Sequence, residues 1–404
     1  MSFLPIITVA ASDSKFNKND DVDFICTGKN DELTINKAIM TAAENDRKIY
    51  FLNGNYYLDN FYDFEDGGPK SAIMTPAIHR DIELIGQSYC YQKHCDGVQF
   101  NVSKEALSKI DDGEFSVLRT QWNDRGIFSG AMLKMENITI VLAHNQKPVR
   151  CIDLRRCDRL EMKNVRVNAF GDTQTNDIFS EELATEGCIG ITMTDGSNNY
   201  IVRYDNVAAI GFYEGIQVGG EHVVMLNCAA AHNVYGYTFG NYDFNCGYNH
   251  PITMINCCDE RNVNLPLFNQ CGDHDRDGNI LIGGQEVSMI SFNIERLATQ
   301  TPGGKLGDVM REIHPGAFCG RIEYTLQPDW NHTNESDFKL FENGSGKGFR
   351  TINMTHKTVC STAERLSYYP SFGQQIFDTD LNKLLICVDV DSKKWVDANG
   401  CVVD

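Results

Sequence analysis

The sequence has no excess of basic residues and no pair of cysteines at Cys-x-x-Cys spacing. Its formal net charge is −19 at pH 7, which argues against nucleic acid and anionic membrane as partners, because both repel an acidic protein. An acidic polysaccharide would need a local basic groove. The 15 cysteines lack metal-ligand spacing. We therefore expect most of them to be small apolar residues of the core, in a protein that is made in a reducing compartment.

The sequence also lacks a recognisable targeting segment. Residues 1–5 show neither a basic stretch nor a long apolar run, so we expect no signal peptide and no membrane insertion. We expect synthesis in the cytoplasm, followed by association with a virion or by release outside the cell. Proline is scarce, with 10 residues beside 34 glycines, which suits many short strands joined by turns.

The positive signal is a repeated corner, where a short apolar strand ends at Asn followed by small or apolar residues. Successive corner asparagines lie 27, 42, 21 and 29 residues apart. A parallel β-helix tolerates this spacing, because insertions leave through loops while strands stay in register, and its stacked amides can form a ladder. The alternative is ordinary turn chemistry in a β-sandwich. The corners are Asn137, Asn164, Asn206, Asn227 and Asn256, with a variant at Ser291.

The N-terminal part predicts one helix followed by strands. Asn30 or Asp31 can cap the helix, which ends near residues 44–46. Residues 48–52 and 56–58 are typical of strands on either side of a turn. The apolar positions at helical spacing are Leu33, Ile35, Ala38, Ile39 and Ala42.

Two stretches resemble a known family. Gly28-Lys29-Asn30-Asp31-Glu32, continued by Ile49-Tyr50-Phe51-Leu52-Asn53-Gly54-Asn55-Tyr56, resembles the opening of the pectate-lyase-like superfamily, and residues 82–88 are similar to the strand and glycine turn that follow there. Asn53 stands where the family usually has Pro. The resemblance implies an all-β, single-stranded, right-handed parallel β-helix over residues 26–360, after an arm at 1–25. The helix at about 31–45 would cap its open end, covering apolar side chains and unpaired strand edges.

The last segment, residues 361–404, resembles a short β module found at the C-terminus of phage tail proteins and of some bacterial surface enzymes. It reads as a β-hairpin with an aromatic anchor at Trp395. This module carries no chemistry by itself.

Aligning the corners places two glutamates in one column. Glu260 and Glu295 stand four residues after their corners, followed by Arg261 and Arg296, and His232 takes the Arg position one turn earlier. Carboxylates stacked on strands about 4.8 Å apart disfavour joint ionisation, which pairs an acid with a base or nucleophile. A separation of about 5–5.5 Å between the two carboxyl groups suits a retaining glycosidase or a transglycosylase. A wider separation admits a water molecule and gives inversion at the anomeric carbon. The alternative is a solvated ion-pair ladder.

Further residues complete the predicted groove. In a lyase, Arg261 or Arg296 would neutralise a uronate while His232 or another base removes the proton. Asp259 is a reserve acid beside the catalytic pair. The expected substrate contacts, whose aromatic members offer faces for sugar rings, are Asp172, Glu214, Tyr235, Tyr242 and Trp122.

One loop matches the first half of a calcium-binding loop. Asp273, Asp275 and Asp277 alternate before Gly278, but Gly284 stands at the twelfth position, which excludes a complete EF-hand. Alternating acids also occur by chance in an acidic protein. Calcium is therefore the candidate cofactor, and we expect catalysis to require none.

These observations predict a carbohydrate-active enzyme that cleaves a polysaccharide or oligosaccharide in a groove along residues 188–300. A glycoside hydrolase-type depolymerase comes first. A polysaccharide lyase and a glycan transferase of the inulin-fructotransferase type are the enzymatic alternatives, and a phage receptor-binding spike is the non-enzymatic one. The resemblance implies a homotrimer.

Overall fold

A computed structural model describes residues 6–15, 21–78, 81–89, 97–122, 132–155, 157–170, 183–192, 202–220, 222–240, 251–268, 285–295, 310–312, 318–327, 340–341, 349–353, 359–367, 370, 374–389 and 392–403. This part of the chain is mostly β, and two long parallel sheets dominate it. Such an arrangement is consistent with a β-helix-like fold. No helix within the described ranges is long and apolar enough to cross a membrane.

The first sheet contains 16 strands among the described residues, and the pairings between its named strands are parallel. Its strands are β1 (Ile6–Ala10), β2 (Phe24–Ile25), β3 (Lys48–Phe51), β4 (Gly54–Leu58), β6 (Asp81–Gly86), β7 (Val98–Val102), β9 (Met132–Leu142), β11 (Arg159–Asn168), β13 (Val202–Ile210), β15 (Val223–Leu226), β16 (Ala229–Ala231), β18 (Ile252–Ile255), β19 (Cys258–Glu260), β21 (Gln285–Glu295), β23 (Phe318–Gln327) and β24 (Phe349–Asn353). Strands β1 and β2 belong to the segment that was expected to form an arm.

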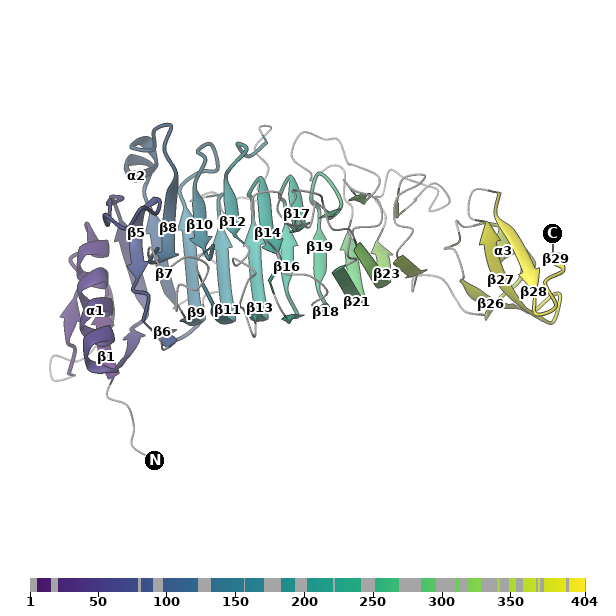
Figure 1. The fold of residues 1–404 in the computed structure, drawn as a ribbon, viewed down its shortest axis with the longest axis horizontal. Coiled ribbons are helices and arrows are strands. Elements are labelled where there is room, and N and C mark those ends of the chain that lie inside the picture. The colour runs from purple at the N-terminus through teal and green to yellow at the C-terminus, as the bar shows by residue number, and fades with distance from the viewer. Residues whose placement is uncertain are drawn as a thin grey trace, which may run out of the picture.

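The second sheet has eight described strands, also paired in parallel. They are β5 (Lys70–Thr75), β8 (Phe115–Thr120), β10 (Arg150–Asp153), β12 (Ile189–Ile191), β14 (Glu214–Val218), β17 (Tyr235–Phe239), β20 (Leu267–Phe268) and β22 (Arg311–Glu312). From β9 to β22 the chain passes through the first sheet and then the second, so each passage adds one or two strands to the first sheet and one to the second (Figure 1). We call one passage a rung.

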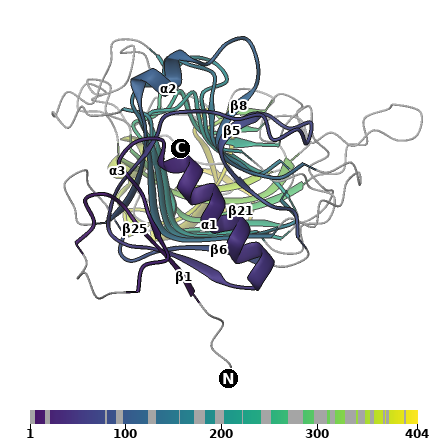
Figure 2. The ribbon, with the colours of Figure 1, turned by 90° about the vertical axis from the view of Figure 1, so that its left-hand side faces the viewer.

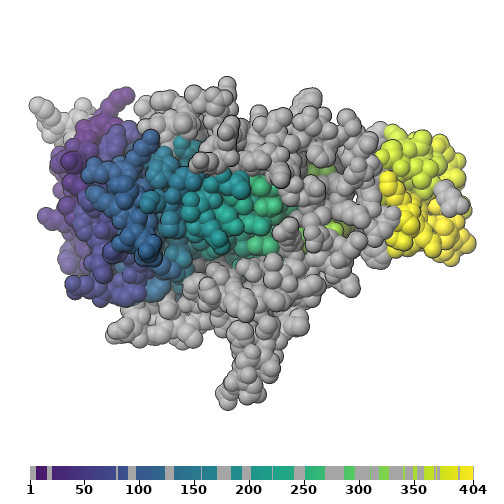
Figure 3. Space-filling view, turned by 90° about the horizontal axis from the view of Figure 1, so that it is seen from above, coloured from purple at the N-terminus to yellow at the C-terminus, as the bar shows by residue number. Residues whose placement is uncertain are grey.

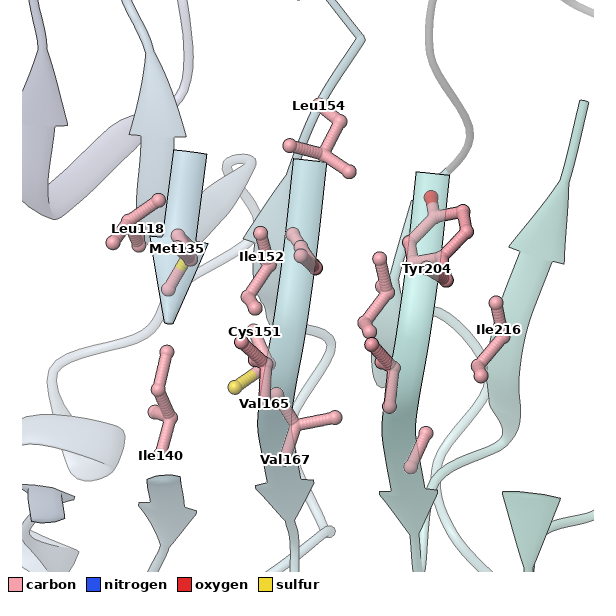
Figure 4. Packing of buried hydrophobic residues seen from close by; sticks show 14 of the residues in the cluster. Leu118, Met135, Ile140, Cys151, Ile152, Leu154, Val165, Val167, Tyr204 and Ile216 are labelled. Carbon is pink, nitrogen blue, oxygen red and sulfur yellow. The ribbon is translucent and has the colours of Figure 1, made fainter. Parts of the chain in front are cut away.

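The core lies between the two sheets and runs through successive rungs. Val165 and Val167 on β11 face Ile152 on β10, and the same pattern continues with Tyr204 and Ile216 on the next rung (Figure 4). All five side chains are at most 2% exposed. Each rung therefore buries its apolar side chains against its neighbours, which explains why short, irregularly spaced strands suffice.

The predicted corners share one backbone conformation and form an amide ladder. All six corner residues have φ between 53° and 58°, in the left-handed region. The Nδ2 of Asn164 donates to Oδ1 of Asn137 at 2.9 Å, and the Nδ2 of Asn206 donates to Oδ1 of Asn164 at 2.8 Å. Asn256 donates likewise to Asn227 at 2.8 Å. The repeat in the sequence thus marks a real structural repeat.

Replacing Asn164 with Ala is expected to destabilise the protein by about 2–4 kcal/mol, because Ala resists the left-handed conformation and breaks two ladder bonds. Asn164→Gly is the matched control: glycine adopts this backbone freely, so it should lose only the ladder contribution, about half of the effect. Chemical denaturation of both variants measures the difference. Equal losses would show that backbone strain does not matter at this corner.

Helix α1 (Asp31–Asn45) occupies the predicted residues and lies across the N-terminal end of the stacked strands (Figure 2). Ile35 and Ile39 are fully buried there, whereas Leu33, expected on the same apolar face, is 55% exposed. The side chain of Asn30 makes no capping hydrogen bond. The Asp31 carboxylate instead accepts the N–H groups of Thr27 and Gly28, at 2.9 Å each, and so orders the segment before the helix.

Two short helices and a third sheet complete the described chain. Helix α2 (Lys104–Ser108) follows β7, and α3 (Thr362–Ser367) follows β25. The third sheet joins β25 (Val359–Cys360), β26 (Gln375–Asp378), β27 (Lys383–Asp389), β28 (Lys394–Asp397) and β29 (Val402–Val403). It packs a small core of its own around the fully buried Trp395. In Figure 3 these residues form a yellow lobe at one end of the molecule.

Candidate active site

Glu260 and Glu295 stand side by side on the outer face of the first sheet. They are the last residues of β19 and β21, and their Cα atoms are direct partners across these adjacent parallel strands. The inward neighbours Asp259 and Ile294 are also partners, and both are 0% exposed. The alternation of a strand therefore turns the two glutamates outward together.

Arg261 ties the two carboxylates into one cluster. Its Nε donates to Oε1 of Glu295 at 2.7 Å, and its Nη2 lies 2.6 Å from the same oxygen. The same Nε lies 3.8 Å from Oε1 of Glu260. The side chains of Arg261, Glu260 and Glu295 are 26%, 33% and 14% exposed, so the cluster is partly open to solvent. Arg261 is thus an ion-pair partner that holds Glu295 in place.

The two glutamates differ in their electrostatic surroundings. Burial, followed by the charge of Glu295, raises the pKa of Glu260, while Arg261 and Arg166 lower it by smaller amounts. A carboxyl whose pKa is raised keeps its proton to higher pH and can serve as a general acid. Glu295, which is ion-paired with Arg261, is the better candidate for the base or nucleophile.

The raised pKa predicts how a neutral residue at position 260 affects stability. A folded-state pKa above the unfolded value means that the protonated form contributes stability, which is lost as pH rises through the folded-state pKa. Glu260→Gln should therefore raise the melting temperature near neutral pH, and this gain should fade in acid. Thermal melts between about pH 3 and pH 7 measure the gain. Glu161→Gln, on the outer face of β11, is the control, and a gain at position 260 that is independent of pH would contradict the prediction.

The outer face between Glu260 and Arg166 carries mostly small side chains, and the exception is Ile210, the Cα partner of Ala231. Arg166 pairs with Ala208, Ala208 with Ala229, and Ala229 with Cys258, one residue position per rung. Ala231 is the direct Cα partner of Glu260. Three alanines and Ile210 therefore lie between two charged positions, and the influence of Arg166 on the pKa of Glu260 reaches across them.

His232 occupies the predicted place in the column. The N–H of His232 donates to the carbonyl of Glu260, and the N–H of Arg261 donates to the carbonyl of Glu295, at 3.0 and 2.7 Å. Both residues have left-handed φ values, 57° and 55°. The His232 ring is only 7% exposed and contacts the edge of Phe170, with centroids 6.2 Å apart. It therefore lies beside the glutamates, packed against Phe170.

Asp259 does not lie beside the outward glutamates, as its place in the sequence predicts. Its side chain is 0% exposed and points into the core, on the opposite face of β19 from Glu260. A Cβ atom at Gly236 would lie 2.7 Å from Oδ2 of Asp259, so the carboxylate packs against the backbone of the second sheet. The expectation of a reserve acid beside the catalytic pair is wrong, because strand alternation separates the two side chains.

Two predicted substrate contacts lie on the second sheet and a third follows one of its strands, whereas the glutamates lie on the first sheet. Glu214 and Tyr235 begin β14 and β17 and are Cα partners. Trp122 follows β8: its N–H donates to Oδ2 of Asp66 at 2.8 Å, and Arg155 lies over its ring at 5.1 Å. The structure thus separates these three residues from the glutamates with which they were predicted to share one groove.

Six predicted residues fall outside the described ranges. They are Arg296, Asp172, Tyr242, Asp273, Asp275 and Asp277. Within the described ranges, no group of three or more His, Cys, Asp or Glu side chains is placed to hold a metal ion.

A second asparagine ladder was not predicted. Oδ1 of the fully buried Asn262 accepts both the N–H and the Nδ2 of Asn233, at 2.7 and 3.0 Å. Asn233 in turn accepts the N–H of Phe212 at 2.8 Å. These asparagines directly follow His232 and Arg261 in the same aligned column, so one further step of the alignment would have found them. They join the turn after β16 to the turn after β19, which carries Arg261.

Comparisons with known proteins add little to this site. No protein-family model matches the chain, and no curated protein does. Among solved structures, the chain is similar to tailspike protein 3 of bacteriophage CBA120, with 11% sequence identity over 97% of this chain and 68% of that chain. The TM-score is 0.17, which is too low for the likeness to support a fold or a function.

Proposed function

We propose that this chain is a right-handed parallel β-helix, closed at its N-terminal end by α1, that cleaves a polysaccharide or oligosaccharide at Glu260 and Glu295. The observation that carries the proposal is the pairing of two partly exposed glutamates on adjacent rungs, where the pKa of Glu260 is raised and Glu295 is ion-paired with Arg261. Two carboxyl groups with different environments are what glycoside hydrolysis requires.

In this proposal Glu260 donates a proton to the leaving oxygen of the glycosidic bond. Glu295 either attacks the anomeric carbon or activates a water molecule, depending on the separation of the two carboxyl groups in the complex. Arg261 orients Glu295, and the small side chains of Ala229 and Ala231, on the rung next to Glu260, leave room for a sugar unit. Cleavage requires no cofactor in this scheme. Calcium bound by the acidic loop at residues 273–277 would be structural.

A non-enzymatic function is supported by the same contacts. The 2.6 Å ion pair between Arg261 and Glu295 joins adjacent rungs, so the column could serve only to hold the rungs of a receptor-binding spike together. A homotrimer that is part of a virion, or that is released from the cell, is compatible with both functions. Light scattering of the purified protein measures the oligomeric state.

A screen against neutral and uronic polysaccharides distinguishes these functions. New reducing ends without absorbance at about 235 nm identify a hydrolase, and growth of that absorbance identifies a lyase. A transferase would give oligosaccharide or cyclic products with few new reducing ends. Glycan binding without any product would leave the receptor-binding spike as the function.

A further inference from the structure

A second polar cluster lies on the outer face of the second sheet. We define the tyrosine cluster as Tyr213, Glu214, Gln217, Tyr235 and Thr238. The side chains on either side of Gln217 and of Thr238 belong to the core, so both polar residues face outward. These core residues are Ile216, Val218, Tyr237 and Phe239.

The members of the tyrosine cluster are contiguous. Glu214 is the Cα partner of Tyr235, and Gln217 is the Cα partner of Thr238, on the adjacent strands β14 and β17. The Nε2 of Gln217 donates to Oε2 of Glu214 at 3.0 Å. The rings of Tyr213 and Tyr235 meet edge to face, with centroids 6.0 Å apart. A line of aromatic, acidic, amide and hydroxyl groups therefore runs from the turn into the sheet.

Thr238 carries the observation that points to a ligand. Its side chain is 2% exposed, and its hydroxyl has no hydrogen-bond partner. Thr192, two rungs earlier at the matching position, accepts the N–H of Leu154 at 2.7 Å and lies 3.4 Å from Oδ1 of Asp153. A buried hydroxyl without a hydrogen-bond partner is unfavourable. A polar group of a ligand bound beside Gln217 and Thr238 would supply the partner that the Thr238 hydroxyl lacks.

The chemistry of the cluster selects the class of ligand. Carboxylate, amide and hydroxyl groups bind the hydroxyls of a sugar, and tyrosine rings pack against its apolar face. Burial, followed by the charges of Glu186, Tyr235 and Glu214, raises the pKa of Tyr213. This acidic surrounding repels an anionic sugar. We propose that the tyrosine cluster is a binding subsite for a neutral pyranose, separate from the glutamate pair on the first sheet.

This inference rests on the proposed glycan ligand but not on cleavage. Affinity electrophoresis of the full chain in gels containing xylan, dextran, galactomannan or polygalacturonate tests it. Wild type and Glu260→Gln should be retarded by at least one neutral polymer and not by polygalacturonate. Glu214→Gln and Thr238→Val should each weaken this retardation at least fivefold, as should Tyr235→Ala. The two conservative variants keep the test valid if Tyr235→Ala fails to fold.

Thr192→Val is the matched control. It removes a satisfied hydroxyl, so it should lower the melting temperature and leave retardation unchanged, whereas Thr238→Val should keep or raise the melting temperature. If Glu214→Gln and Thr238→Val are both retarded as strongly as the wild type, the proposed subsite is overturned, even if cleavage is found. Loss of retardation in these variants supports it, even if no polymer is cleaved. Equal retardation by polygalacturonate, or none by any polymer, also overturns it.

Discussion

Replacing Glu260 with Gln is expected to lower the rate of glycan cleavage by about 10²- to 10⁴-fold, the usual contribution of general acid catalysis. The substitution keeps the shape of the side chain but removes the proton whose pKa burial and Glu295 raise. Glu295→Gln should cause a loss at least as large, because it removes the base or nucleophile. Reducing-end release by the wild type and both variants on one cleaved polymer measures the effect.

The design separates catalysis from folding and from binding. Glu161→Gln changes another outward glutamate of the first sheet, on β11, and should leave the rate unchanged. Glu260→Gln should also flatten the alkaline limb of the pH–rate profile, since that limb reports ionisation of the acid. Wild-type rates in both Glu260→Gln and Glu295→Gln would rule out this pair as the catalytic residues.

Breaking the ion pair between Asp66 and Arg119 is expected to destabilise the protein by about 3–5 kcal/mol, because the remaining charge would stay buried without its partner. Nη1 and Nη2 of Arg119 each donate to one oxygen of Asp66 at 2.7 Å, and Nε donates to the carbonyl of Pro69 at 2.8 Å. The side chains of Arg119 and Asp66 are 0% and 6% exposed. Chemical denaturation of Asp66→Asn and Arg119→Met measures the loss.

Two comparisons test the cause of this loss. The double variant Asp66→Asn/Arg119→Met should recover part of the stability, because no uncompensated charge remains. Lys163→Met is the surface control: its ion pair with Glu136 spans 3.8 Å with a half-exposed lysine, so its loss should cost at most about 1 kcal/mol. An Asp66→Asn loss no larger than the control would contradict the argument.

The same ion pair should make stability depend on pH. Burial by itself would raise the pKa of Asp66, but hydrogen bonds from Arg119 and from the N–H of Trp122 outweigh burial and lower it. A lowered folded-state pKa contributes stability above the usual Asp pKa, and this contribution is lost as pH falls through the lowered value. Wild type should therefore lose more stability in acid than Asp66→Asn does.

Much of the fold follows from local sequence patterns. The asparagine corners could be recognised because a left-handed turn favours Asn and recurs on each rung, and their alignment correctly stacked Glu260 on Glu295 and His232 on Arg261. The bounds of α1 were also predictable, since apolar residues at helical spacing mark the helix and the polar residues at its two ends mark where it begins and ends. These features depend on interactions within one rung or between neighbouring rungs.

Other features needed the tertiary structure. Sequence proximity predicts that Asp259 and Glu214 lie with Glu260 and Glu295, but strand alternation buries Asp259, and the turn after β13 carries Glu214 onto the second sheet. The acid role assigned to Glu260 and the unpartnered hydroxyl of Thr238 depend on burial and on neighbours from other strands.

The repeated corner is therefore enough to predict which residues stack from rung to rung, because it sets the register. Which of these residues face solvent, which face the core and which charges meet could be read only from the folded protein. Burial and electrostatics depend on the packing of whole sheets, whereas the register depends on a few backbone angles that recur in each repeat.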